Sequence, residues 1–170
     1  MKSRLFLLLI FLLPALAAAQ ERNFIIDSGS LAWRKVYTET ASLGAVSRNF
    51  AASGLFDNIQ AGDSLLTAEM HSVMLNYKDL GYRRMSLPLY IVNDSFSGFV
   101  TVQIREGRYR VTVERIMTHS PQTGDGTLEY FALPGGAFKP DFLKSPAHII
   151  DYTFDCIFRS IGKIDDDDEW

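Results

Sequence analysis

The sequence predicts an α+β domain in which helices cover one face of a curved antiparallel sheet. Two patterns indicate this class. Apolar and polar residues alternate on both sides of Glu106-Gly107, which is typical of a β-hairpin. Residues 41–53 and a stretch beginning at Ser145 instead repeat apolar residues every three or four positions, as amphipathic helices do. The expected order of elements is one strand, a helix, four or five strands and a final helix.

The hairpin over residues 98–117 has a register that the sequence specifies strongly. Counting outward from the turn gives three apolar pairs on one face, namely Ile104 with Tyr109, Val102 with Val111, and Val100 with Val113. The other face carries Arg105 with Arg108, Gln103 with Arg110, and Thr101 with Thr112. A shift of one residue would turn every arginine into the core, so the register is fixed by burial.

Helix signals occur at two places. Leu43, Val46 and Phe50 form one apolar stripe, with Ser42 as the N-cap and Gly54 as the stop. The final helix begins at Ser145-Pro146, since proline suits the first helical position, and it ends at Gly162. Its predicted buried stripe consists of Ile150, Phe154, Ile157, Phe158 and Ile161.

Strand signals are weaker. Residues 31–38 alternate aromatic and β-branched side chains and predict a strand, and residues 20–30 predict an edge strand or a loose segment. Residues 85–92 also read as a strand, at an edge or interrupted, because Pro88 lacks an N–H group. Residues 118–144 are rich in proline and glycine and predict a long loop with a short strand at 128–131.

The N-terminus has the three parts of an export signal. Lys2 and Arg4 are followed by an apolar run and by the small residues before Ala19, so cleavage is expected between Ala19 and Gln20. We expect a signal peptide over residues 1–19, one domain over 20–163 and an acidic tail over 164–170. The mature protein is then exported, to the periplasm or the outer surface, and has no transmembrane segment.

The charge and the cysteine count exclude some functions. The chain has 17 Lys and Arg against 20 Asp and Glu, and removal of the signal leaves 15 basic residues and a net charge of −5. An acidic chain is a poor ligand for nucleic acid, so we expect no nucleic-acid partner. Cys156 is alone, which excludes an internal disulfide. Its apolar neighbours predict a structural, half-buried thiol rather than a nucleophile.

Catalytic and metal-binding motifs are absent from the sequence. His71, His119 and His148 lie on different predicted elements, and they have no zinc spacing and no short spacing to Cys156. His119 is placed in a loop, and His148 is expected to be solvated. We therefore expect no enzyme, no cofactor and no metal. The alternative is a cell-envelope hydrolase with a site assembled from dispersed residues such as His71, Glu69 and Asp79.

The polar face of the hairpin is the main candidate for a binding surface. Its residues are Arg105, Arg108, Arg110 and Gln103, with Thr101 in line. Guanidinium groups on adjacent strands can bind carboxylates or phosphates through two hydrogen bonds each. The plainer interpretation is an ordinary solvated sheet face. Trp170, at the end of the acidic tail, is a second candidate contact, and the tail itself could fold back onto the arginines.

Several segments together resemble a known family. They are residues 77–81 (YKDLG), 88–91 (PLYI), 98–100 (GFV) and above all 106–113 (EGRYRVTV), with Leu31, Trp33 and Val36 in the opening strand. This set is similar to uncharacterised exported bacterial domains described as having a TATA-binding-protein-like (TBP-like) fold. The resemblance covers about residues 31–117. It implies the curved sheet described above and no catalytic residues.

The resemblance also bears on residues 63–81, which have two interpretations. Leu66, Met70, Val73, Tyr77 and Leu80 have helical spacing, whereas the resemblance implies a strand followed by a turn that ends at Gly81. We adopt the strand and turn. The function predicted from the sequence is a non-enzymatic exported domain that binds a protein or a cell-envelope component; a purely structural assembly role is the remaining alternative.

Overall fold

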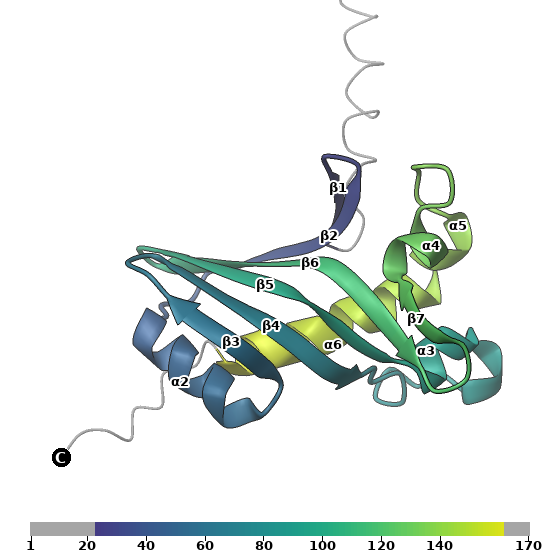
Figure 1. The fold of residues 1–170 in the computed structure, drawn as a ribbon, viewed down its shortest axis with the longest axis horizontal. Coiled ribbons are helices and arrows are strands. Elements are labelled where there is room, and N and C mark those ends of the chain that lie inside the picture. The colour runs from purple at the N-terminus through teal and green to yellow at the C-terminus, as the bar shows by residue number, and fades with distance from the viewer. Residues whose placement is uncertain (1–22, 162–170) are drawn as a thin grey trace, which may run out of the picture.

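The computed structural model describes residues 23–161, which form one antiparallel sheet with helices packed mainly on one face (Figure 1). Within these residues the strand order is β1-β2-β6-β5-β4-β3, and a short strand β7 also pairs with β6. The strands are β1 (Phe24–Asp27), β2 (Ser30–Tyr37), β3 (Phe56–Ala61), β4 (Leu65–Met74), β5 (Ser95–Arg105), β6 (Arg108–Ser120) and β7 (Gly124–Thr127). The predicted fold class is confirmed.

The hairpin of β5 and β6 has the predicted register. Val100 pairs with Val113 and Val102 with Val111, and all four side chains are at most 1% exposed. Gly107 adopts a φ of 68°, the left-handed conformation that the two-residue turn requires. The register therefore buries the valines beneath the helices and leaves the arginine side on the open face of the sheet.

Two longer helices cover the apolar side of the sheet. They are α2 (Leu43–Ser53) and α6 (Ser145–Ile161). In α2 the Ser42 side chain accepts a hydrogen bond from the Ala45 N–H, and Gly54 ends the helix with a left-handed φ of 67°, both as predicted. The helix α6 begins at Ser145 as predicted, and it runs along the sheet (Figure 1).

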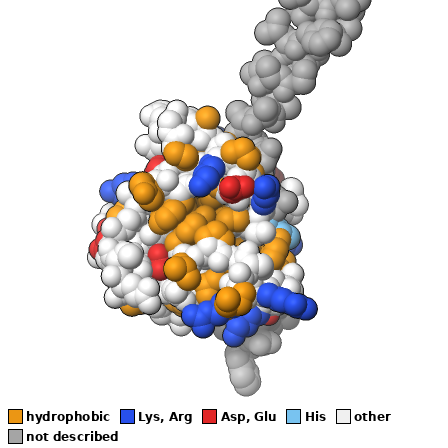
Figure 2. Space-filling model, turned by 90° about the vertical axis from the view of Figure 1, so that its right-hand side faces the viewer, with side chains coloured by type: hydrophobic (Ala, Val, Ile, Leu, Met, Phe, Trp, Pro, Cys, Tyr) orange, Lys and Arg blue, Asp and Glu red, His pale blue; other side chains and the backbone are white. Residues whose placement is uncertain are grey.

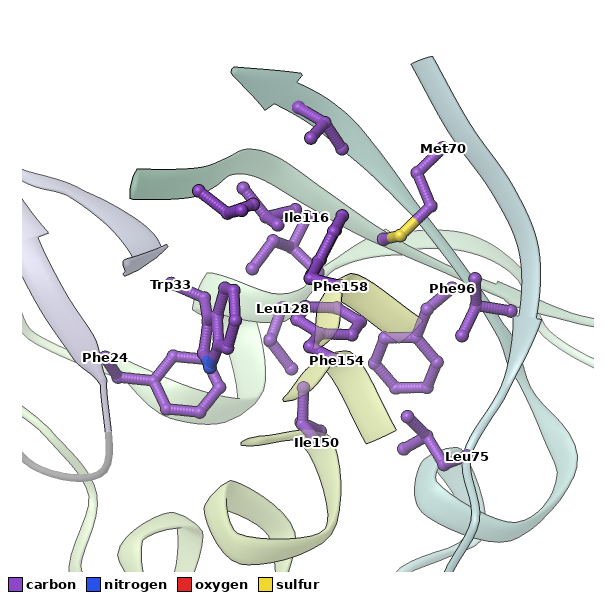
Figure 3. Packing of buried hydrophobic residues seen from close by; sticks show 14 of the residues in the cluster. Phe24, Trp33, Met70, Leu75, Phe96, Ile116, Leu128, Ile150, Phe154 and Phe158 are labelled. Carbon is purple, nitrogen blue, oxygen red and sulfur yellow. The ribbon is translucent and has the colours of Figure 1, made fainter. Parts of the chain in front are cut away.

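Aromatic side chains join α6 to the sheet. Trp33 of β2 stacks on Phe158 and meets Phe154 edge to face, with ring centroids 5.6 Å apart in both pairs (Figure 3). Phe158 also lies within 6.4 Å of the ring of Phe50 and 6.0 Å of the ring of Phe56. The indole Nε1 of Trp33 donates to Asp151 of α6 at 2.8 Å, so the buried polar atom of this aromatic cluster has a partner.

The strand and turn adopted for residues 63–81 are confirmed. The strand β4 spans Leu65–Met74, and the turn that follows closes with a hydrogen bond from the Tyr82 N–H to the Tyr77 carbonyl. The helical spacing of the apolar residues misleads here because β4 changes register relative to β5 between Met70 and Val73. An extra residue at this shift moves Val73 back to the buried side, which breaks the strict alternation of a strand.

The predicted strand over residues 85–92 is wrong. This segment forms a short 3₁₀ turn (Arg84–Ser86) and the helix α3 (Leu89–Asn93). Pro88 precedes the first turn of α3, where its fixed φ of −58° is compatible with a helix start and no N–H is needed. Ile91 and Val92 are both buried, and two successive buried residues fit a helix better than an alternating strand.

The predicted loop over residues 118–144 contains more structure than expected. β6 continues to Ser120, β7 follows, and the predicted strand at 128–131 is instead the helix α4 (Leu128–Ala132). Leu128 and Ala132 are both fully buried. They are four residues apart, which places both side chains on the same face of a helix. The helix α5 (Pro140–Leu143) precedes α6. The strand β3 was not predicted, since most of its side chains are exposed and it lacks apolar alternation.

Candidate functional site

The four predicted binding residues of the hairpin lie around one hollow on the open face. Arg105, Arg108, Arg110 and Gln103 line it, together with Val36 and Tyr109. Its volume is about 220 Å³. The side chains converge because β2, β6 and β5 are adjacent strands, with Val36 opposite Arg110 and Arg110 opposite Gln103. Thr101, which the sequence placed in line with them, is not part of the hollow.

The charge of this hollow is positive. None of the ion pairs among residues 23–161 includes Arg105, Arg108 or Arg110, and no acidic side chain lines the hollow. The Arg110 guanidinium donates to the Gln103 side-chain oxygen, a neutral acceptor that orients the cation without neutralising it. Three cations therefore lie at one end of the sheet, and in the described part of the chain none of them is paired with a carboxylate.

Tyr109 supports this end of the sheet from below. Its side chain is buried, stacks on Tyr37 with ring centroids 4.7 Å apart, and donates its hydroxyl to the Phe158 carbonyl at 3.1 Å. Burial, and then the nearby charge of Glu39, raise the pKa of the Tyr109 phenol above its ordinary value. The phenol thus stays neutral and keeps the strand that carries Arg108 and Arg110 fixed to α6.

The other predicted positions at the two ends of the chain lie outside the described residues. These are the cleavage site at Ala19 and Gln20, the acidic tail over residues 164–170 and Trp170. The signal peptide and the location of the mature protein remain predictions from the sequence.

The residues of the hydrolase alternative are only partly brought together. His71 and Glu69 line a second hollow of about 490 Å³, which also lies on the open face, over β4, β5 and β6. Asp79 does not line it, since its carboxylate instead accepts a hydrogen bond from the Asn76 side chain in the turn after β4. The Nε2 atom of His71 lies 3.1 Å from a carboxylate oxygen of Asp57 on β3.

Sequence reasoning missed the other polar residues of the second hollow, which include Ser97, Arg115 and His119. His119 was assigned to a loop, but it lies on β6 with Ser95 opposite it. In this part of β6 Met117 and His119 are partly buried and Thr118 is buried. Because the buried residue is polar, the apolar alternation that marks the hairpin does not extend to it in the sequence.

Two predictions for individual side chains are wrong. Cys156 is exposed rather than half-buried. It lies two residues from both Phe154 and Phe158, and two residues correspond to about 200° around a helix, so the thiol points away from the buried stripe. His148 was expected to be solvated but is partly buried, with its Nδ1 atom 3.2 Å from the Tyr82 hydroxyl.

An apolar patch occupies the end of the molecule that carries α3 and α4, away from the hairpin turn (Figure 2). The side chains of Met85, Leu89 and Tyr130 are 96%, 69% and 78% exposed. Beneath them, the rings of Tyr90 and Phe131 stack with centroids 4.1 Å apart, which joins α3 to α4. The patch is separate from both hollows of the open face.

Within residues 23–161, no helix is both long enough and apolar enough to cross a membrane. In the same residues, no group of three or more His, Cys, Asp or Glu side chains is arranged to hold a metal ion.

Comparison with known proteins identifies the fold. No protein-family model matches the sequence, and no curated protein matches it. The structure is similar to a DUF4468 family protein from Bacteroides ovatus, with a TM-score of 0.51, 12% identity and coverage of 85% of this chain and 93% of the other. It is also similar to a TBP-like protein from Parabacteroides distasonis, with a TM-score of 0.51, 9% identity and coverage of 79% and 92%. The protein has a TBP-like fold.

The TBP-like fold confirms the resemblance inferred from the sequence. Both similar structures come from bacteria, and one is described only as a member of a family of unknown function. At 9–12% identity the likeness establishes the architecture alone, so the function must be argued from the residues of this chain.

Proposed function

We propose that this TBP-like domain is an exported binding module whose arginine hollow holds an anionic group of its partner. The partner is a protein or a cell-envelope component that presents carboxylate or phosphate groups. The single observation that carries the proposal is the set of three arginines that line one hollow without any ion pair in the described part of the chain. Guanidinium groups bind carboxylates and phosphates alike through paired, charge-assisted hydrogen bonds.

The surrounding structure favours binding at this hollow. The Gln103 oxygen orients Arg110, and the Tyr109 hydroxyl fixes β6 to α6. These groups therefore lose less conformational entropy when a ligand binds. Val36 is 51% exposed beside Arg110 and offers an apolar contact next to the charges. An anionic group carried on a short apolar portion can therefore contact both the arginines and Val36.

The test is the double substitution of Arg108 and Arg110 by alanine. We expect the unaltered protein to bind citrate or inorganic phosphate at low salt, and the Arg108→Ala/Arg110→Ala protein to bind them at least about tenfold more weakly, since each lost charge-assisted hydrogen bond is worth about 1.5–3 kcal/mol. Calorimetric titration measures the affinity, and NMR shifts of the arginine Nε–H groups locate the site. Binding should also weaken as salt is added.

The matched control is Arg83→Ala/Arg84→Ala, which removes the same charge from exposed arginines at the other end of the molecule. This control should bind as the unaltered protein does. Equal loss of affinity in both double variants would show that net charge, and not the hollow, attracts the anion. Unchanged affinity in Arg108→Ala/Arg110→Ala would refute the proposed function.

A further inference from the structure

The second hollow lies where three neighbouring strand pairings change register. The β3–β4, β4–β5 and β5–β6 pairings each shift at about the same level of the sheet. A non-glycine residue with left-handed φ lies beside each shift: Asn58 at 52°, Ser72 at 57° and Arg115 at 50°. Left-handed backbone is unfavourable for residues other than glycine, and bulges redirect side chains, so the side chains at this level of the sheet depart from regular alternation.

A glycine beside Ser97 allows the strands to approach closely there. A Cβ atom on Gly98 would lie 2.9 Å from a methyl carbon of Val113 and 3.2 Å from the Glu114 carbonyl oxygen. A larger residue at this position would therefore force the Val113 side chain to move and would crowd the Glu114 carbonyl. The position of Ser97, immediately before the glycine, is thereby set by the packing of β5 against β6.

Three polar side chains from adjacent strands form a continuous hydrogen-bonded series in this region. The Oγ atom of Ser97 on β5 lies 2.7 Å from Nε2 of His119 on β6. The Nδ1 atom of His119 lies 2.8 Å from a carboxylate oxygen of Asp125 on β7. In the tautomer with the proton on Nδ1, Asp125 accepts that proton's hydrogen bond and Nε2 is left to accept the hydrogen bond from Ser97. This is the arrangement of an activated serine nucleophile.

The hollow that Ser97 lines also contains a positive charge. Ser97 and His119 both line it, and so does Arg115, whose guanidinium lies 4.7 Å from the centre of the Phe99 ring. A permanent cation close to a reacting carbonyl stabilises the negative charge that develops on its oxygen. The open shape of the hollow admits a group that projects from a larger molecule.

We propose that Ser97, His119 and Asp125 form a hydrolytic site for carboxylic esters. The Ser97 oxygen forms a bond to the acyl carbon while its proton moves to Nε2 of His119. The ester C–O bond then breaks, the leaving alcohol takes the proton from Nε2, and the acyl group remains on Ser97. A water molecule gives a proton to Nε2 and attacks the acyl carbon, which releases the carboxylic acid and returns the proton to Ser97. Water is the second reactant, and the sum is ester plus water giving acid plus alcohol.

This activity departs from the absence of catalysis that the sequence predicts, and it is independent of the proposed binding function. Ser97 and Gln103 are six residues apart on β5, which corresponds to about 20 Å along a strand. A purely structural interpretation of the same hydrogen bonds, in which His119 fastens β7 to β6, predicts no nucleophilic reactivity at Ser97.

The test uses a fluorophosphonate probe, which forms a phosphorus–oxygen bond with an activated serine and loses fluoride. We expect the probe to attach to Ser97 of the unaltered protein, as located by mass spectrometry of the peptides, and we expect turnover of p-nitrophenyl acetate. Ser97→Ala should abolish both reactions. His119→Gln should slow probe attachment at least about 100-fold, the usual contribution of a general base.

The matched control is Ser95→Ala, because Ser95 lies two residues from Ser97 on the same strand and directly opposite His119. This variant should react as the unaltered protein does. The proposal is overturned if the probe attaches to another residue or does not attach at all. It is also overturned if the probe attaches to Ser97 of His119→Gln as fast as to Ser97 of the unaltered protein. Peptide mapping of the unaltered protein shows whether Ser97 reacts with the probe even if a variant fails to fold. This result does not depend on whether the arginine hollow binds anions.

Discussion

Replacing Val102 by aspartate is expected to lower the free energy of unfolding by at least about 4 kcal/mol. Val102 is 1% exposed and pairs with Val111 beneath the helices. Lys35 of β2 lies opposite Val111, but its ammonium is already paired with Asp155 of α6 at 2.9 Å. A loss of this size is a large part of the stability of an ordinary domain. Chemical denaturation followed by circular dichroism measures it.

The control for this substitution is the next residue. Gln103 points to the open face and lines the arginine hollow, so Gln103→Asp should change the stability by no more than about 1 kcal/mol. Two adjacent positions thus receive the same charge on opposite faces of one strand. Similar losses of stability at both positions would contradict a sheet that helices cover on one face and that is open on the other.

Replacing Phe158 by alanine is expected to cost about 3–5 kcal/mol. Phe158 is 1% exposed, and its ring contacts aromatic rings from β2, α2 and β3 as well as one from its own helix, so no single element can collapse into the space left behind. Thermal and denaturant unfolding measure the loss. Phe99→Ala is the control, since Phe99 lies on the open face beneath Arg115 and should cost about 1 kcal/mol or less. A smaller loss for Phe158 than for Phe99 would contradict the observed packing.

The elements predicted correctly are those in which local pattern and burial agree. The hairpin has one face of valines and one of arginines, so only one register is possible, and it was found. The helix α2 has its cap at Ser42 and its stop at Gly54 in the sequence. These signals are local and each has a specific physical cause, which is why they can be read without the tertiary structure.

The elements predicted wrongly are short, and tertiary contacts determine them. α3 and α4 have five residues each, fewer than a stable isolated helix needs, and they form because Ile91 and Leu128 are buried in the core. β3 has few buried side chains and forms by pairing with β4. No periodicity in the sequence reports such elements, since their stability comes from residues distant in the chain.

The candidate sites divide in the same way. The arginine hollow was predicted because its residues lie on one hairpin, where sequence distance and register give their positions. The second hollow brings together residues of β3, β4, β5 and β6, and the register shifts between these strands leave no simple pattern in the sequence. Asp125 also lies between two glycines, in a segment that reads as a turn.

The arginine side of the hairpin is open, and its valine side is covered by helices. Thiol accessibility measures this directly in a Cys156→Ser background, which removes the exposed native thiol. The thiol of Arg110→Cys should react readily with a charged maleimide, whereas the thiol of Val111→Cys should be protected at least about 100-fold until the protein is unfolded. Rapid reaction at position 111 together with protection at position 110 would contradict the account.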